Sequence, residues 1–102
     1  MNKTENLYNC LRGIESNMQR LRTEERVLDY RIQEIFIDWM NAEQYGRRIN
    51  QDRQHLQRKF IESCNNRIAE IERRLKFQGS LHARLMDIFG ERLRADFAKF
   101  LN

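Results

Sequence analysis

Large apolar residues recur along the first 40 residues of the chain at steps that alternate between four and three. Ten positions follow this spacing; nine hold a large apolar side chain, and the tenth holds a glutamate. The positions are Leu7, Leu11, Ile14, Met18, Leu21, Glu25, Leu28, Ile32, Ile35 and Trp39. A 3.5-residue repeat is typical of a helix that packs along another helix. The pattern therefore predicts a long helix over about residues 4–44, with Thr4 as its N-cap.

Gly46 is the first position after this helix where the chain can turn easily. We interpret Tyr45, Gly46 and Arg47 as the bend of a hairpin. The competing interpretation is one continuous helix to about Phe77 that tolerates Gly46 in its interior, at a cost of about 1 kcal/mol. We favour the bend, because the apolar repeat of the first helix loses its large side chains at Ala42 and Gly46.

A second apolar stripe predicts a second helix over about residues 48–78. It consists of Ile49, Leu56, Phe60, Cys64, Ile68, Ile71 and Leu75. Leu56, Phe60, Cys64 and Ile68 follow one another at steps of four, which predicts a stutter in the helical pair. Gly79 and Ser80 then mark the clearest boundary, since glycine ends helices and serine caps them. We therefore expect a third helix over about residues 81–101, with apolar residues around more than half of its circumference.

The expected fold is all-α: a long antiparallel helical hairpin resembling a coiled coil, with the third helix packed back on it. The whole chain, residues 1–102, is expected to form one domain. An elongated fold of this size buries little core by itself. We therefore expect a homodimer that forms a helical bundle.

A bend at Gly46 places residues opposite each other when their numbers sum to about 92. Ile32 then faces Phe60, and Glu25 faces Arg67. We expect Glu25 and Arg67 to form an ion pair within the seam. Such a pair adds little net stability but can fix the register of two helices.

Several apolar and aromatic side chains near the bend and near the C-terminus are candidates for binding a larger protein partner. Phe36, Ile37 and Met40 lie off the predicted seam, and monomers rarely leave such a patch exposed. The candidate partner-binding residues are Phe36, Ile37, Trp39, Met40, Phe97 and Phe100.

The charge of the chain is uneven. The net charge is +4, and arginine is the commoner cation. Residues 1–46 hold six Lys/Arg and eight Asp/Glu, whereas residues 47–76 hold nine Lys/Arg and four Asp/Glu. The basic helix either complements the acidic one or contacts nucleic-acid phosphates. For the nucleic-acid alternative, the candidate residues are Arg47, Arg48, Arg53, Arg58, Lys59 and Arg67.

The sequence offers no sign of catalytic chemistry. His55 and His82 stand alone, Cys10 and Cys64 match no metal or redox spacing, and no glycine-rich phosphate loop is present. We therefore expect no enzyme activity, cofactor, metal or small-molecule substrate. No stretch reaches the ~18 apolar residues of a membrane span, and no secretory signal is visible, so we expect a cytoplasmic protein without membrane contact.

Two functional classes remain. The first is a non-enzymatic coiled-coil interaction protein: an adaptor, chaperone, assembly factor or inhibitor of a larger machine. The second is a nucleic-acid-associated regulator that works through the arginines of the second helix.

Overall fold

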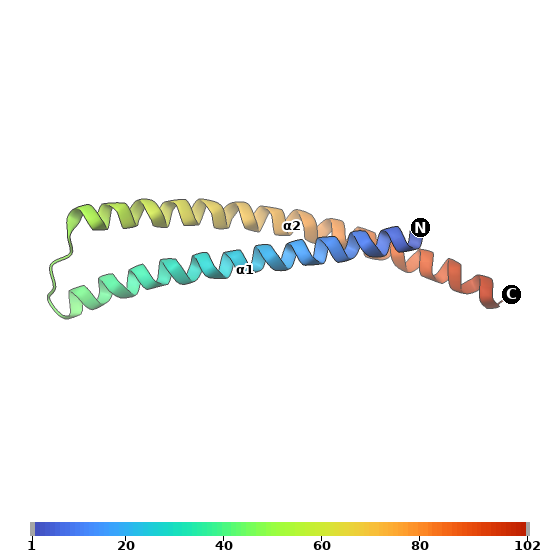
Figure 1. Cartoon of the computed structure of the whole chain (residues 1–102), viewed down its shortest axis with the longest axis horizontal. Coiled ribbons are helices and arrows are strands. Elements are labelled where there is room, and N and C mark those ends of the chain that lie inside the picture. The colour runs from blue at the N-terminus through green and yellow to red at the C-terminus, as the bar shows by residue number, and fades with distance from the viewer. Residues whose placement is uncertain (1, 102) are drawn as a thin grey trace. The chain divides into compact units, whose positions relative to one another are not determined.

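The computed structural model describes residues 2–101, which form two long helices (Figure 1). Helix α1 spans Lys3–Gln44 and helix α2 spans Gln51–Leu101. The all-α prediction is thus confirmed for the described residues. Neither helix is long and apolar enough within these residues to cross a membrane.

By their internal contacts the residues form two compact units. The hairpin unit is Arg22–Glu72 and contains the end of α1, the connecting loop and the start of α2. The terminal unit joins Met1–Leu21 to Arg73–Asn102. In each unit a segment of α1 lies antiparallel beside a segment of α2 (Figure 1).

The bend lies where the sequence predicts it. Gly46 has a φ of +64°, a conformation that favours glycine because it lacks a Cβ atom. The Gly46 amide donates to the Glu43 carbonyl and the Arg47 amide donates to the Ala42 carbonyl, which together form a Schellman cap. The competing interpretation of one continuous helix through Gly46 is therefore wrong.

Both helices begin at an asparagine cap. Asn2 Oδ1 accepts a hydrogen bond from the Glu5 amide at 2.7 Å, so the cap of α1 is Asn2 and not the predicted Thr4. Asn50 Oδ1 accepts from the amides of Asp52 and Arg53 at 2.9 and 3.2 Å, so α2 starts three residues later than predicted.

The predicted third helix is wrong, because α2 continues without a break through Gly79 and Ser80. Among the glycines of the described residues, Gly46 alone has a positive φ. Gly79 therefore keeps an ordinary helical backbone. The missing side chain of Gly79 leaves room for Met18 of α1: a Cβ atom on Gly79 would lie 3.8 Å from Met18 Cε. Gly79 is therefore a packing position within the helix, not its end.

The continuity of α2 predicts that Gly79→Ala stabilises the chain by about 0.5–1 kcal/mol. Alanine favours a helix interior over glycine by this amount, and 3.8 Å is an ordinary van der Waals distance from Met18. Urea denaturation followed by circular dichroism measures the change. Gly46→Ala is the matched control and should destabilise, because its φ of +64° strains an L-residue. A loss of stability in Gly79→Ala would mean that α2 ends there.

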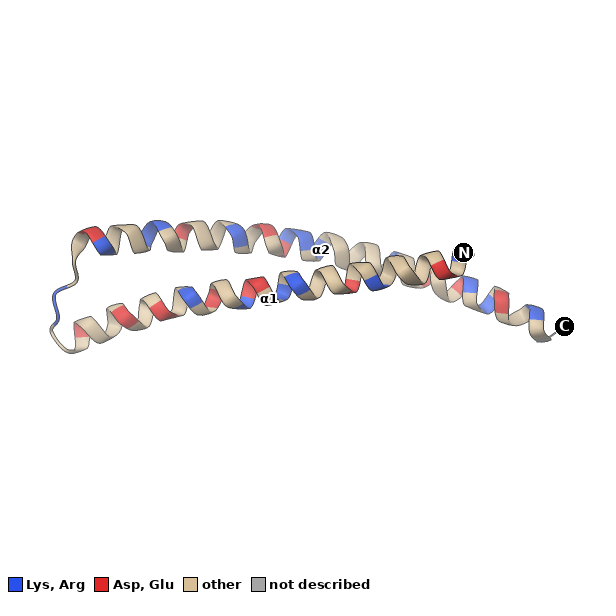
Figure 2. Ribbon diagram, in the orientation of Figure 1, with Lys and Arg blue, Asp and Glu red and all other residues tan. Residues whose placement is uncertain are grey.

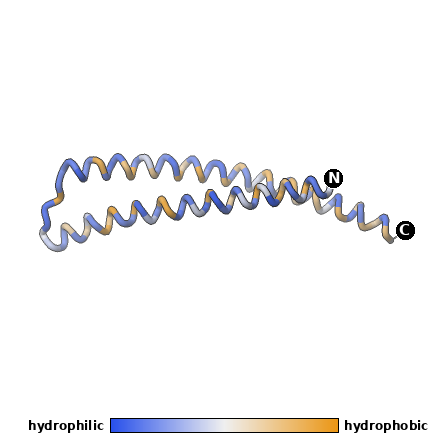
Figure 3. The backbone as a smooth tube through the Cα atoms, in the orientation of Figure 1, coloured by the Kyte–Doolittle hydropathy of each residue, from blue (hydrophilic) through white to orange (hydrophobic). Residues whose placement is uncertain are grey.

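The seam of α1 is the predicted one. All ten predicted positions are buried or half-buried, and Leu11 and Leu21 are the most deeply buried of them. The orange apolar positions recur along both helices in Figure 3. The 3.5-residue repeat therefore identified the side of α1 that faces α2.

The seam of α2 differs from the predicted stripe. Its less exposed positions follow alternating steps of three and four, without the predicted stutter. The buried and half-buried positions that keep this spacing are Gln54, Gln57, Ile61, Cys64, Ile68, Ile71, Leu75, Gln78, His82, Leu85 and Phe89. Leu56 and Phe60, which the sequence placed on the stripe, are exposed. The seam agrees with the predicted stripe at Cys64, Ile68, Ile71 and Leu75, whereas the predicted steps of four before Cys64 drift around the helix and away from the side that faces α1.

Candidate interaction surfaces

Three of the predicted partner-binding residues form an exposed apolar surface on the hairpin unit. Phe36, Ile37 and Met40 come from the last third of α1 and are all exposed. Ile37 and Met40 are three residues apart, so their side chains lie one helical turn apart. We call these three residues the hairpin face.

A groove of about 420 Å³ lies beside the hairpin face, between α1 and α2 of the same unit. Its apolar lining comes from Ile35 and Ile37, and its polar rim includes Glu34, Asp38 and Arg53. Ile37 thus belongs to both the face and the groove. The arrangement can accept an apolar side chain from a helix that lies along α1.

Trp39, the fourth predicted residue near the bend, lies in the seam. Its side chain is half-buried, and its Nε1–H donates a hydrogen bond to Gln57 Oε1 at 2.7 Å. The Phe36 ring packs edge-on against the Trp39 ring, with centroids 5.6 Å apart and planes at 83°. Trp39 therefore supports the hairpin face from beneath, by holding Phe36 in place.

Phe97 and Phe100, the other two predicted partner-binding residues, lie near the end of α2 in the terminal unit, and both are exposed. Thr4 at the start of α1 donates a hydrogen bond to Asp96 Oδ2 at 2.7 Å. The first turn of α1 is therefore level with Asp96, and α2 continues beyond it (Figure 1).

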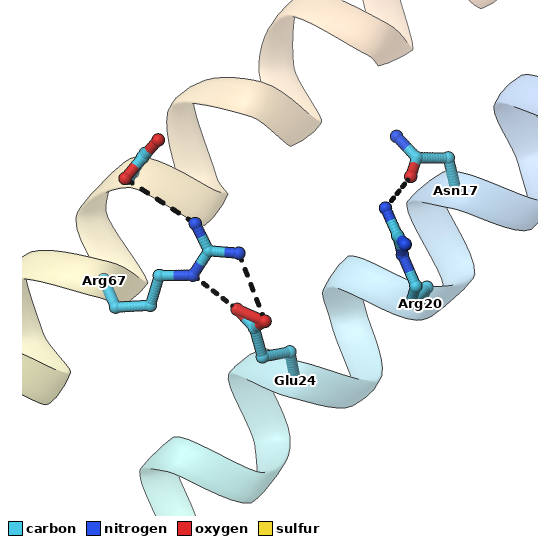
Figure 4. Close-up of polar contacts among 5 residues, drawn as sticks. Asn17, Arg20, Glu24 and Arg67 are labelled. Carbon is cyan, nitrogen blue, oxygen red and sulfur yellow. Dashed lines mark hydrogen bonds and ion pairs between the residues drawn. The ribbon is translucent and has the colours of Figure 1, made fainter.

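Arg67 pairs with Glu24, so the predicted pair of Arg67 with Glu25 is corrected. Arg67 Nε and Nη2 donate to the two Glu24 carboxylate oxygens at 2.6 and 3.1 Å (Figure 4). A second carboxylate, Glu70, lies 3.6 Å from Arg67 Nη1. The hydrogen bond to Glu24 raises the pKa of the Arg67 guanidinium above its usual value. Glu25 remains in the seam, and its Oε2 is buried without a hydrogen-bond partner.

This geometry predicts which double-mutant cycle shows coupling. Glu24→Leu and Arg67→Leu should couple, because each removes one half of a two-bond charge-assisted contact. Glu25→Leu and Arg67→Leu should combine additively. The free energies of unfolding of the single and double variants give both couplings. If Arg67 couples with Glu25 and not with Glu24, the observed pairing is contradicted and the register predicted from the sequence is supported.

The predicted nucleic-acid residues of the hairpin unit do not form one surface. Figure 2 shows basic residues recurring along α2, interspersed with acidic ones. Arg67 is bonded to Glu24, and Arg53 Nη2 lies 3.8 Å from Asp38 Oδ2. Arg47, Arg48 and Arg53 line one pocket of about 220 Å³ at the start of α2, whereas Arg58 and Lys59 are exposed further along the helix. The Arg47 guanidinium also lies 5.6 Å from the centre of the Tyr45 ring.

The seam contains polar residues that the sequence did not suggest. Gln57 accepts the hydrogen bond of Trp39, and His82 Nε2 lies 3.0 Å from Glu15 Oε1. Gln78 Oε1 is buried without a partner. In the sequence, only their alternating spacing of three and four with Ile61, Ile71 and Leu75 indicated that Gln57, Gln78 and His82 belong to the seam.

Within residues 2–101, no group of three or more His, Cys, Asp or Glu side chains is arranged to hold a metal ion. Both cysteines are free thiols: Cys64, which lies on the predicted apolar stripe, is buried, whereas Cys10 is exposed.

Comparison of the chain with protein-family models, with curated proteins and with solved structures finds no match.

Proposed function

We propose that this chain is a non-enzymatic helical interaction protein that binds a larger protein through the hairpin face. Adaptors, chaperones, assembly factors and inhibitors of larger machines act in this way. The observation that carries the proposal is the exposure of Phe36, Ile37 and Met40 on a helical pair whose seam is already filled by other residues. Soluble chains rarely leave contiguous large apolar side chains exposed without a binding role.

The charges around the hairpin face indicate the chemistry of the partner. Residues 32–46 of α1 and the following loop hold Glu34, Asp38 and Glu43 and no lysine or arginine, and the one cation on the rim of the groove, Arg53, lies 3.8 Å from Asp38. An amphipathic helix with apolar side chains one turn apart and basic residues on its flanks would complement this surface. We therefore propose a basic amphipathic helix of a protein as the bound segment.

A photoreactive side chain at Met40 tests this proposal. Met40 and Leu56 are equally exposed, at 67%, and both belong to the hairpin unit, so Leu56 is the matched control position. In an extract of the source cells, the probe at Met40 should give one dominant protein adduct that survives nuclease treatment. The probe at Leu56 should not give this adduct. An adduct with nucleic acid, or equal protein adducts at both positions, would contradict the proposal.

Nucleic-acid binding is the second candidate function. It is favoured by the shared pocket of Arg47, Arg48 and Arg53, since arginine clusters suit phosphate. This function predicts retention on RNA or DNA that falls steeply between about 50 and 200 mM salt. Alanine at all three positions should then abolish retention. The absence of retention at low salt excludes this second function.

A further inference from the structure

A second apolar stripe runs along the C-terminal part of α2, beside the seam that faces α1. Six uncharged residues follow one another at steps of three, four, three, four and three. They are Ala83, Met86, Gly90, Leu93, Phe97 and Phe100. Met86, Leu93, Phe97 and Phe100 are all exposed in the structure. We call these six residues the C-terminal stripe.

The spacing of the C-terminal stripe is that of a helix–helix contact. Its alternating steps of three and four repeat those of the α2 seam, which contains Leu85 and Phe89. A helix with two such seams packs against two neighbours. α1 supplies the first neighbour, whereas the second seam extends past the Thr4–Asp96 contact, beyond the first turn of α1.

We propose that the C-terminal stripe binds the same stripe of a second copy of this chain, with the two α2 helices antiparallel about a two-fold axis. This inference concerns a different surface from the hairpin face and does not depend on the proposed function. The stripe lies next to the α1–α2 seam on α2 and has the same spacing, so the occupant it fits is a further helix with an apolar face.

The stripe is complementary to itself in the antiparallel orientation. With the axis between Glu91 and Arg92, Phe100 meets Ala83 of the second copy and Phe97 meets Met86 of the second copy. Leu93 meets Gly90 of the second copy, so a large side chain faces a smaller one at every level. A parallel pair in register would instead place Phe97 on Phe97 and leave Gly90 opposite Gly90.

Charge supports the same register. Asp87 and Arg94 each follow a stripe residue by one position, so they flank the stripe on one side. In the antiparallel pair, Asp87 of one chain lies near Arg94 of the other. Opposite charges at flanking positions set the orientation of paired helices.

The exposed area leaves room for such an interface. The chain exposes 8464 Å², whereas a compact monomer of 12.5 kDa exposes about 6,200 Å². A standard protein interface removes about 800 Å² from each partner. The excess area is therefore more than an interface of ordinary size requires.

Light scattering of the full chain, coupled to size-exclusion chromatography, tests the proposal. The wild type should approach about 25 kDa, twice the chain mass, as its concentration rises. Phe97→Ser should weaken dimerisation at least tenfold. Phe77→Ser is the matched control, because Phe77 is 70% exposed, Phe97 is 65% exposed, and Phe77 lies off the stripe. Circular dichroism checks that both variants remain helical. A monomer at all concentrations up to about 100 μM, or equal weakening by both substitutions, overturns the proposal.

Charge exchange tests the antiparallel register. Asp87→Arg and Arg94→Asp should each weaken the dimer, because each places like charges beside one another. The double exchange restores opposite charges and should recover most of the wild-type affinity. A double variant weaker than either single variant contradicts the antiparallel register.

Discussion

Replacing Ile71 with alanine is expected to lower the free energy of unfolding by about 3 kcal/mol. Ile71 is 0% exposed and is the largest fully buried side chain among the described residues. Truncating a buried isoleucine loses the transfer free energy of its methyl groups and leaves a cavity, which together cost about 2–5 kcal/mol. The seam of the hairpin unit has few other deeply buried side chains to compensate, since Cys64 is the other buried one in that unit.

Leu56→Ala is the control for this loss. Leu56 lies on the same helix and in the same unit but is exposed, so its truncation should change the stability by no more than about 0.5 kcal/mol. Urea denaturation at one fixed protein concentration compares both variants with the wild type. Equal costs at the two positions would mean that the seam of α2 runs through Leu56, as the sequence stripe suggested.

Glu25→Leu is expected to stabilise the chain, by about 1–2 kcal/mol. Glu25 occupies a seam position of α1, and its Oε2 is buried without a hydrogen-bond partner. A buried acceptor without a partner costs about 1–3 kcal/mol, and leucine removes this cost while keeping a strong helix former.

The adjacent substitution Glu24→Leu separates this effect from a general gain in hydrophobicity. Glu24 accepts both hydrogen bonds from Arg67, so its loss should destabilise the chain. Thermal unfolding of the two variants should therefore move the midpoint in opposite directions. A lower midpoint for Glu25→Leu would show that the Glu25 carboxylate has a hydrogen-bond partner in solution and stabilises the alignment of α1 with α2.

The α1 helix could be predicted closely from the sequence, because its seam is carried by large apolar side chains at unbroken spacing. The bend could be predicted because Gly46 adopts a conformation that only glycine adopts readily. At Gly79 the same reasoning predicted the end of a helix, whereas Gly79 lies inside α2. A glycine inside a helix and a glycine at its end have the same identity, and the packing of Met18 on Gly79 depends on a residue far away in sequence.

The seam of α2 could not be found from hydrophobicity alone. Leu56 and Phe60 are more apolar than Gln57, but Gln57 lies opposite Trp39 and accepts its hydrogen bond. Each step of four turns by about 40° around an α-helix, so the predicted run from Ile68 back to Leu56 leaves the side of α2 that faces α1. Gln57 and Ile61 keep the alternating spacing and stay in the seam.

The candidate surfaces were predicted in part. Phe36, Ile37 and Met40 were singled out because they lie off the seam, and Phe97 and Phe100 because they are aromatic residues near the C-terminus; the structure exposes all five. Trp39 was named with them although the 3.5-residue repeat also placed it in the seam, where its indole nitrogen bonds across the hairpin. The large apolar residues of the C-terminal stripe were expected on a separate third helix, among positions that cover more than half of its circumference, so the sequence did not separate this stripe from the seam that faces α1.

The most direct measurement of the central claim is the dissociation constant between this chain and the protein partner captured at Met40. Trp39 is the single tryptophan, and its ring contacts Phe36, so its fluorescence reports binding at the hairpin face. Met40→Ser should raise the dissociation constant at least tenfold, and the equally exposed Leu56→Ser should leave it within twofold of the wild type. Equal dissociation constants for Met40→Ser and the wild type would contradict the assignment of the hairpin face as the protein-binding surface.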